Sequence, residues 1–132
     1  MSVEHQMYQA AVELVERRYP TDWGGAASVR LATGEIITSV APDDDFDALS
    51  LCMEVGGFLE AHKQNQAVTH SLCLYRETET SSFKLLTPCG ICQERLRFWG
   101  EDVLVAVTTP ENALLFKPLR DLQNFHWSTA YR

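Results

Sequence analysis

The fold of this chain is predicted from two segments, CMEVGGFLEAHK at residues 52–63 and PCGICQERLRFWG at residues 88–100. Apolar residues recur every three or four positions in both segments, which predicts two helices. The first helix is expected from about residue 50 to residue 63, with Cys52 in its first turn. A proline opens the second segment and a glycine closes it, as is usual at the two ends of a helix.

Short β-rich runs lie on either side of these two helices. Residues 26–31 and 35–40 flank a Thr33-Gly34 turn and predict a hairpin, and residues 68–75 predict a buried strand. A leading helix, two late strands and a short terminal helix are expected at residues 3–18, 103–108, 113–116 and 119–127. The order α-β-β-α-β-α-β-β predicts an α/β fold with helices on both faces of a mixed sheet, in three layers, α/β/α.

Composition limits the possible partners. The chain has 132 residues with 45% hydrophobic and 22% charged positions, which predicts one globular domain over residues 1–132. Its formal net charge of −7, without a basic run, argues against a nucleic-acid polymer as partner. No stretch is apolar enough for a membrane span, and the N-terminus lacks the apolar run of a signal peptide. We therefore expect no membrane association and a cytoplasmic location.

Cysteines carry the chemistry that the sequence predicts. Four cysteines in a cytoplasmic chain stay reduced, so Cys89 and Cys92, spaced C-x-x-C at a helix start, indicate a metal or redox site. Cys52 shares the setting of a helix N-terminus, where thiolates are favoured. Three thiolates leave the fourth tetrahedral position of zinc for water, which ionises near neutral pH at a catalytic site of this kind. Glu54, two residues after Cys52, is the candidate proton shuttle.

Cys52-Met53-Glu54, followed by Pro88-Cys89-Gly90-Ile91-Cys92, matches the zinc deaminase signature, in which the glutamate is not a ligand. With this pair of motifs the chain resembles the cytidine deaminase superfamily, in particular the three-cysteine branch that acts on free nucleosides and includes blasticidin S deaminases. The resemblance covers nearly the whole chain and also includes Gly25-Ala26-Ala27 and the aromatic tail. It implies a five-stranded sheet, zinc between the two motif helices, and a homo-oligomer, a tetramer or a dimer, whose neighbouring subunits help to close each pocket.

The chain departs from the family pattern where substrate is bound. Ala41 and Asp43 stand where ribose-binding relatives place Asn and Glu, so Asp43 is the remaining candidate for a sugar hydroxyl. Asp22 replaces a base-stacking Phe, with Trp23 beside it as a substitute. Phe125 and Trp127 in the tail are candidates either for the core or for the pocket. Gln93 replaces an arginine that would offset the charge of three thiolates, a role left open to Arg95 or Arg76.

Two functions follow as hypotheses. In the first, the protein is a zinc-dependent hydrolase that converts the 4-amino group of a free cytosine nucleoside into a uracil-type product and ammonia. Cytidine, deoxycytidine and an analogue such as blasticidin S all remain possible small-molecule substrates. In the second, the domain is a non-catalytic, zinc-stabilised binding module, although Glu54 would then have no role. Buried inert thiols, a redox C-x-x-C pair, and iron in place of zinc are the other interpretations of the cysteines.

Overall fold

A mixed β-sheet organises the chain. In the computed structural model, which describes residues 1–131, the strands follow the order β2-β1-β3-β5-β6, and the short β4 pairs with β3 beside that path. The strands are β1 Gly24–Leu31, β2 Ile36–Ser39, β3 Val68–Arg76, β4 Lys84–Leu85, β5 Leu104–Ala106 and β6 Phe116–Pro118. β3 and β5 are parallel and the other pairs are antiparallel. The expected mixed sheet is confirmed, with β4 as a strand beyond the five expected.

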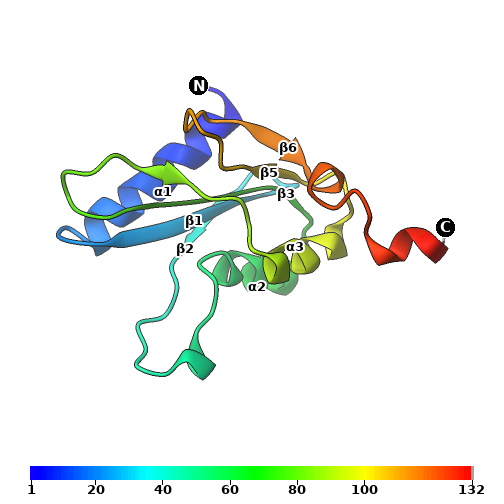
Figure 1. Cartoon of the computed structure of the whole chain (residues 1–132), viewed down its shortest axis with the longest axis horizontal. Coiled ribbons are helices and arrows are strands. Elements are labelled where there is room, and N and C mark those ends of the chain that lie inside the picture. The colour runs from blue at the N-terminus through cyan, green and yellow to red at the C-terminus, as the bar shows by residue number, and fades with distance from the viewer. Residues whose placement is uncertain (132) are drawn as a thin grey trace.

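Helices cover both faces of the sheet, as Figure 1 shows. They are α1 Val3–Arg18, α2 Val55–Gln64 and α3 Gly90–Leu96. α1 packs on one face through a buried stripe that includes Met7 and Val15. α2 and α3 contribute Phe58 and Leu96 to a separate core cluster with other strand residues. The three-layer α/β/α architecture predicted from the order of elements is confirmed.

The boundaries differ most from the expected ones at three places. α2 begins at Val55, so Cys52 lies in the turn before the helix and not in its first turn. The last strand begins at Phe116, later than expected, because Asn112 holds the preceding segment in a turn with hydrogen bonds to the backbone of Phe83 and Leu85. The expected terminal helix is replaced by two 3₁₀ turns, η3 Leu119–Leu122 and η4 Trp127–Tyr131.

Gly34 turns the chain between β1 and β2 with φ of 95°, a conformation that glycine adopts without steric cost. The predicted hairpin turn is therefore confirmed. Among the helices of residues 1–131, none combines the length and the apolar character that crossing a membrane requires.

Candidate active site

Three cysteine sulfurs meet between the segments that open α2 and α3. Cys52 precedes α2, Cys89 is the N-cap residue of α3, and Cys92 lies in the first turn of that helix. Their Sγ atoms all lie within 4.8 Å of one another, and those of Cys52 and Cys89 are 3.3 Å apart. Sulfurs that share one tetrahedral zinc ion are roughly 3.8 Å apart, so the three residues fit such an ion with small adjustments. The site can hold a metal with one position left open.

Ser39 at the end of β2 fixes the segment that carries Cys52. Its hydroxyl donates a hydrogen bond of 2.6 Å to the carbonyl of Met53 and accepts one of 3.3 Å from the backbone N–H of Gly57. One side chain therefore ties the Cys52-Met53-Glu54 turn and the first turn of α2 to the sheet. The side chain also satisfies one of the N–H groups that a helix start leaves without an internal partner.

A reciprocal pair of threonines fixes the segment that carries Cys89. The backbone N–H of Thr87 donates to Thr108 Oγ1 over 2.9 Å, and the N–H of Thr108 donates to Thr87 Oγ1 over 2.8 Å. Thr108 Oγ1 also donates to the carbonyl of Leu85. These bonds connect the chain ahead of Pro88 to the end of β5, and so hold the cysteine pair in place beside Cys52.

Glu54 is buried beside the sulfurs, with only 4% of its surface exposed. Burial raises the pKa of its carboxyl group, whereas hydrogen bonds from its own backbone N–H and from Cys92, together with the charge of Arg95, act in the opposite direction. A carboxyl group with a raised pKa holds and releases a proton closer to neutral pH than an exposed one. Such a group is suited to carry protons between water and a bound molecule.

The three thiols have different electrostatic environments. Burial raises the pKa of Cys52 and also that of Cys92, where the negative charge of Glu54 adds to the effect. Burial also acts to raise the pKa of Cys89. Backbone hydrogen bonds from Cys92 and Ile91 and a hydrogen bond with Cys52 outweigh it and lower this pKa below its usual value. Cys89, at the N-terminus of α3, is thus the thiol that most readily becomes a thiolate.

A cavity of about 290 Å³ opens over Cys52, Glu54 and Cys89. Its other lining residues are mainly apolar: Trp23, Ala41, Leu51, Met53, Cys73, Leu86 and Thr87. A mostly apolar cavity with a few converging polar groups is the usual form of a small-molecule site. Gly25 lets two of the lining side chains pack close to β1, because a Cβ there would lie 2.6 Å from Met53 Sδ and 2.9 Å from the Trp23 ring.

The predicted substrate contacts divide into two groups. Trp23 lines the cavity and packs against Tyr75, with ring centroids 6.4 Å apart, and Ala41 lines it as well. Asp43 is not among the lining residues; its Oδ2 accepts a hydrogen bond of 2.6 Å from Arg18 Nη2 at the exposed end of α1. The structure therefore brings Trp23 next to the cysteine cluster and leaves Asp43 in an exposed ion pair.

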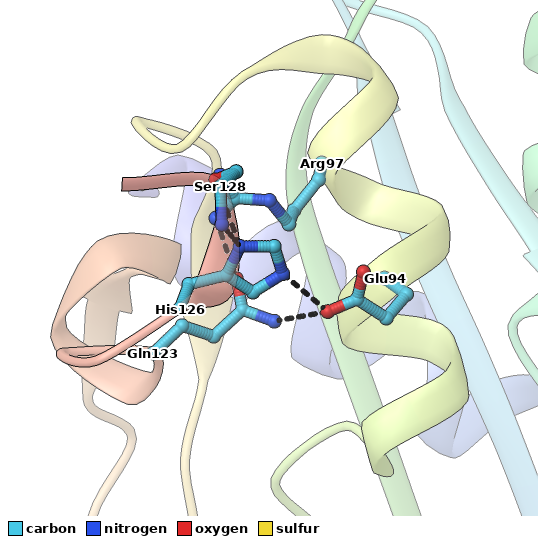
Figure 2. Close-up of polar contacts among 5 residues, drawn as sticks. All are labelled: Glu94, Arg97, Gln123, His126 and Ser128. Atoms are coloured by element: carbon cyan, nitrogen blue, oxygen red, sulfur yellow. Dashed lines mark hydrogen bonds and ion pairs between the residues drawn. The ribbon is translucent and has the colours of Figure 1, made fainter. Parts of the chain in front are cut away.

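Phe125 and Trp127 lie in the C-terminal segment, outside the cavity of their own chain, and are 98% and 69% exposed. A polar clamp pins this segment to α3 and the turn after it, as Figure 2 shows. Its members are Glu94, Arg97, Gln123, His126 and Ser128. In the clamp, His126 Nε2 lies 2.7 Å from Glu94 Oε1, and Arg97 donates to Gln123 and Ser128 over 2.8 and 2.7 Å. The two aromatic side chains are thus held outward on an anchored segment.

Some of the lining residues carry no sequence signal of their own. Leu86 and Thr87 join the cavity because β4 pairs with β3, a contact that no local pattern indicates. Cys73 lies in β3 and is only 6% exposed, and it also lines the cavity. Proximity to Pro88-Cys89 was the only signal that could have identified Thr87.

Solved structures of cytidine deaminases resemble this chain over most of its length. The crystal structure of the cytidine deaminase from Bacillus anthracis matches with a TM-score of 0.96 and 52% sequence identity, covering 98% of this chain and 93% of that chain. Cytidine deaminases from Mycobacterium leprae and Burkholderia pseudomallei match with TM-scores of 0.69 and 0.70. They are 18% and 16% identical over 89% and 92% of this chain and 94% and 96% of theirs, and so show the shared fold alone. No family model and no curated protein matches this chain.

Proposed function

Because this chain belongs to the cytidine deaminase family and is a zinc-dependent hydrolase, we propose that it deaminates a free cytosine nucleoside at the 4-amino position. The products are a uracil-type nucleoside and ammonia. The observation that carries the proposal is the convergence of three cysteine sulfurs and a buried glutamate on one mostly apolar cavity. We take residues 1–132 to act as one domain.

In this proposal Cys52, Cys89 and Cys92 hold the zinc ion and leave one position free for the reaction. When bound there, zinc makes a water molecule acidic enough to react near neutral pH. The cysteines supply only the charge and the geometry. Their segments are held to the sheet by Ser39, Thr87 and Thr108, so the three sulfurs are positioned before the metal arrives.

Glu54 is the proposed catalytic residue. Its carboxylate takes one proton from the attacking water and delivers it to the ring nitrogen N3. It then takes the second proton, from the hydroxyl group now attached to C4, and gives it to the amine, which leaves as ammonia while the C4 carbonyl forms. Both transfers need a group that is not fixed in one protonation state, and burial of Glu54 raises its pKa toward that condition. The apolar lining of the cavity excludes other water from the two transfers.

The sugar is the least constrained part of the substrate. Trp23 offers an aromatic surface at the cavity, whereas Ala41 has no hydrogen-bonding side chain and Asp43 is paired with Arg18. A pocket with few polar contacts to the sugar discriminates weakly between hydroxyl patterns. We therefore propose that cytidine, deoxycytidine and an analogue such as blasticidin S are all candidate substrates, with Asp43 available to a sugar hydroxyl only if it leaves Arg18.

We further propose a homo-oligomer, a tetramer or a dimer, in which Phe125 and Trp127 contact the pocket of a neighbouring copy. Their exposure on an anchored segment supports this arrangement. Free thiols as zinc ligands need a compartment that keeps them reduced, which supports action in the cytoplasm. The acidic charge supports a small-molecule substrate over a nucleic-acid polymer.

The test is a substrate panel of cytidine, deoxycytidine, cytosine and blasticidin S with purified protein of known zinc content. Loss of the aminopyrimidine absorbance and release of ammonia are followed together. Turnover of a nucleoside supports the proposal and identifies the sugar that is accepted. Absence of turnover on all four, with zinc bound and the fold intact, would contradict it and favour a non-catalytic binding module.

A further inference from the structure

A guanidinium group reaches one of the cysteine sulfurs. Arg95 follows Cys92 by three residues on α3, a spacing that places two side chains on the same face of a helix. Its Nη1 donates a hydrogen bond to Cys92 Sγ over 3.6 Å. Cys92 is fully buried and Arg95 is exposed, so a solvated cation contacts a sulfur that solvent does not reach. Arg95 also acts electrostatically on Cys52 and Glu54.

The other side chains considered for this role are engaged elsewhere. Gln93, at the position where the family pattern has arginine, donates through Nε2 to the carbonyl of Pro88 over 2.8 Å. Arg76 donates to the carbonyl of Glu79, and its guanidinium lies 4.9 Å from the centre of the Phe83 ring. Of the two arginines that the sequence left as candidates to offset the thiolate charge, Arg95 is therefore the one that contacts a cysteine sulfur.

The charge balance of metal binding shows what such a contact does. Three thiolates around one Zn²⁺ leave a net charge of −1, whereas the same three groups as free thiols are neutral. A fixed cation beside the sulfurs lowers the free energy of the charged, zinc-loaded state and leaves that of the neutral thiols nearly unchanged. Such a cation therefore favours zinc binding.

We propose that Arg95 is a positioning residue of the metal site, which donates a hydrogen bond to the Cys92 thiolate and offsets the negative charge of the zinc-loaded form. The inference rests on the proposed function, because it needs zinc on the three cysteines. It adds a fourth residue to the site, drawn from a position outside both motifs. Loss of that residue weakens zinc binding even when no substrate is present.

The test measures zinc affinity by competition with a chromophoric chelator for the wild type, Arg95→Ala and Arg95→Lys. Removing a residue that hydrogen-bonds to a metal ligand costs on the order of tenfold in affinity where the residue is exposed, and we expect that loss for Arg95→Ala. Arg95→Lys keeps the charge and should lose less. Arg17→Ala removes an exposed arginine from α1 and should bind zinc like the wild type. Wild-type affinity in Arg95→Ala, or an equal loss in Arg95→Lys, would overturn the proposal.

Cobalt substitution provides a second readout, which does not depend on activity. A hydrogen bond to a thiolate lowers the energy of its lone pair, so its removal in Arg95→Ala should move the thiolate-to-cobalt charge-transfer band to longer wavelength. An unchanged band would contradict the contact. If the wild type itself binds no zinc, the proposed function fails; if the wild type binds zinc and deaminates while both Arg95 variants match it, only the role of Arg95 fails.

Discussion

Trp23 differs from the other predicted substrate contacts because it lines the cavity of its own chain. We expect Trp23→Ala to raise KM for a cytosine nucleoside about tenfold, since the loss of one aromatic stacking partner costs roughly 1–3 kcal/mol per base. Trp23→Phe keeps an aromatic face and should stay within a few-fold of the wild type. Steady-state kinetics of the two variants at equal zinc content provide the measurement. An unchanged KM in Trp23→Ala would show that this residue does not contribute to substrate binding.

For single residues, the sequence was informative where the chemistry depends on their spacing. Cys52-Met53-Glu54 and the Cys89–Cys92 pair could be recognised as candidates because a metal site needs particular residue types at short separations. Arg95 and Gln93 could not be assigned in the same way. Their roles depend on side-chain directions, toward Cys92 Sγ in one case and the Pro88 carbonyl in the other, which the sequence leaves undetermined.

At the scale of elements, the start of α2 shows why helix boundaries are hard to predict. The apolar pattern includes Leu51 at helical spacing, yet Leu51 is 48% exposed at the cavity and lies outside the helix. The hydroxyl of Ser39 accepts the N–H of Gly57 and thereby fixes where the helix begins. That bond comes from a strand 18 residues away, so no local pattern contains it.

The polar clamp is the element-scale feature that holds the C-terminal segment (Figure 2). His126→Ala removes the contact with Glu94, and we expect faster amide hydrogen exchange over residues 123–131. The free energy of global unfolding should fall by no more than about 1 kcal/mol, because the Glu94 partner is half exposed to solvent. Exchange measured by mass spectrometry tests this prediction.

Arg120→Ala provides the matched control for the clamp. Arg120 forms an exposed ion pair with Asp102 on the neighbouring turn and is not a member of the clamp. Its removal should leave exchange over residues 123–131 unchanged. Equal exchange in His126→Ala and the wild type would show that the segment is held by other contacts.

At the scale of the whole molecule, the α/β/α layering was predictable because helical and strand periods alternate along the chain. The sheet order was not predictable, since β4 and the parallel contact of β3 with β5 join segments far apart in sequence. Zinc adds a further long-range connection in this account. It joins the segment before α2 to α3, which the sequence separates by the whole of β3.

Metal removal should therefore destabilise the folded protein. We expect the melting temperature to fall by about 10 °C when a chelator removes zinc. A ligand that binds only the native state stabilises it by an amount that grows with the logarithm of the ligand concentration relative to its dissociation constant. Differential scanning calorimetry before and after zinc is restored measures the shift. A protein with Cys89→Ser and Cys92→Ser should show no zinc-dependent shift. Complete zinc removal without a change in melting temperature would contradict the predicted coupling.

The role of Glu54 is tested most directly by the rate of uracil-nucleoside formation, measured for the wild type and for Glu54→Gln, each loaded with one zinc ion per chain. Glutamine keeps the size of the side chain but cannot carry the proton. We expect zinc content and fold to stay unchanged while kcat falls by about 10²–10⁴-fold. A Glu54→Gln protein with near wild-type turnover would contradict the assignment of Glu54 as the proton shuttle beside Cys52, Cys89 and Cys92.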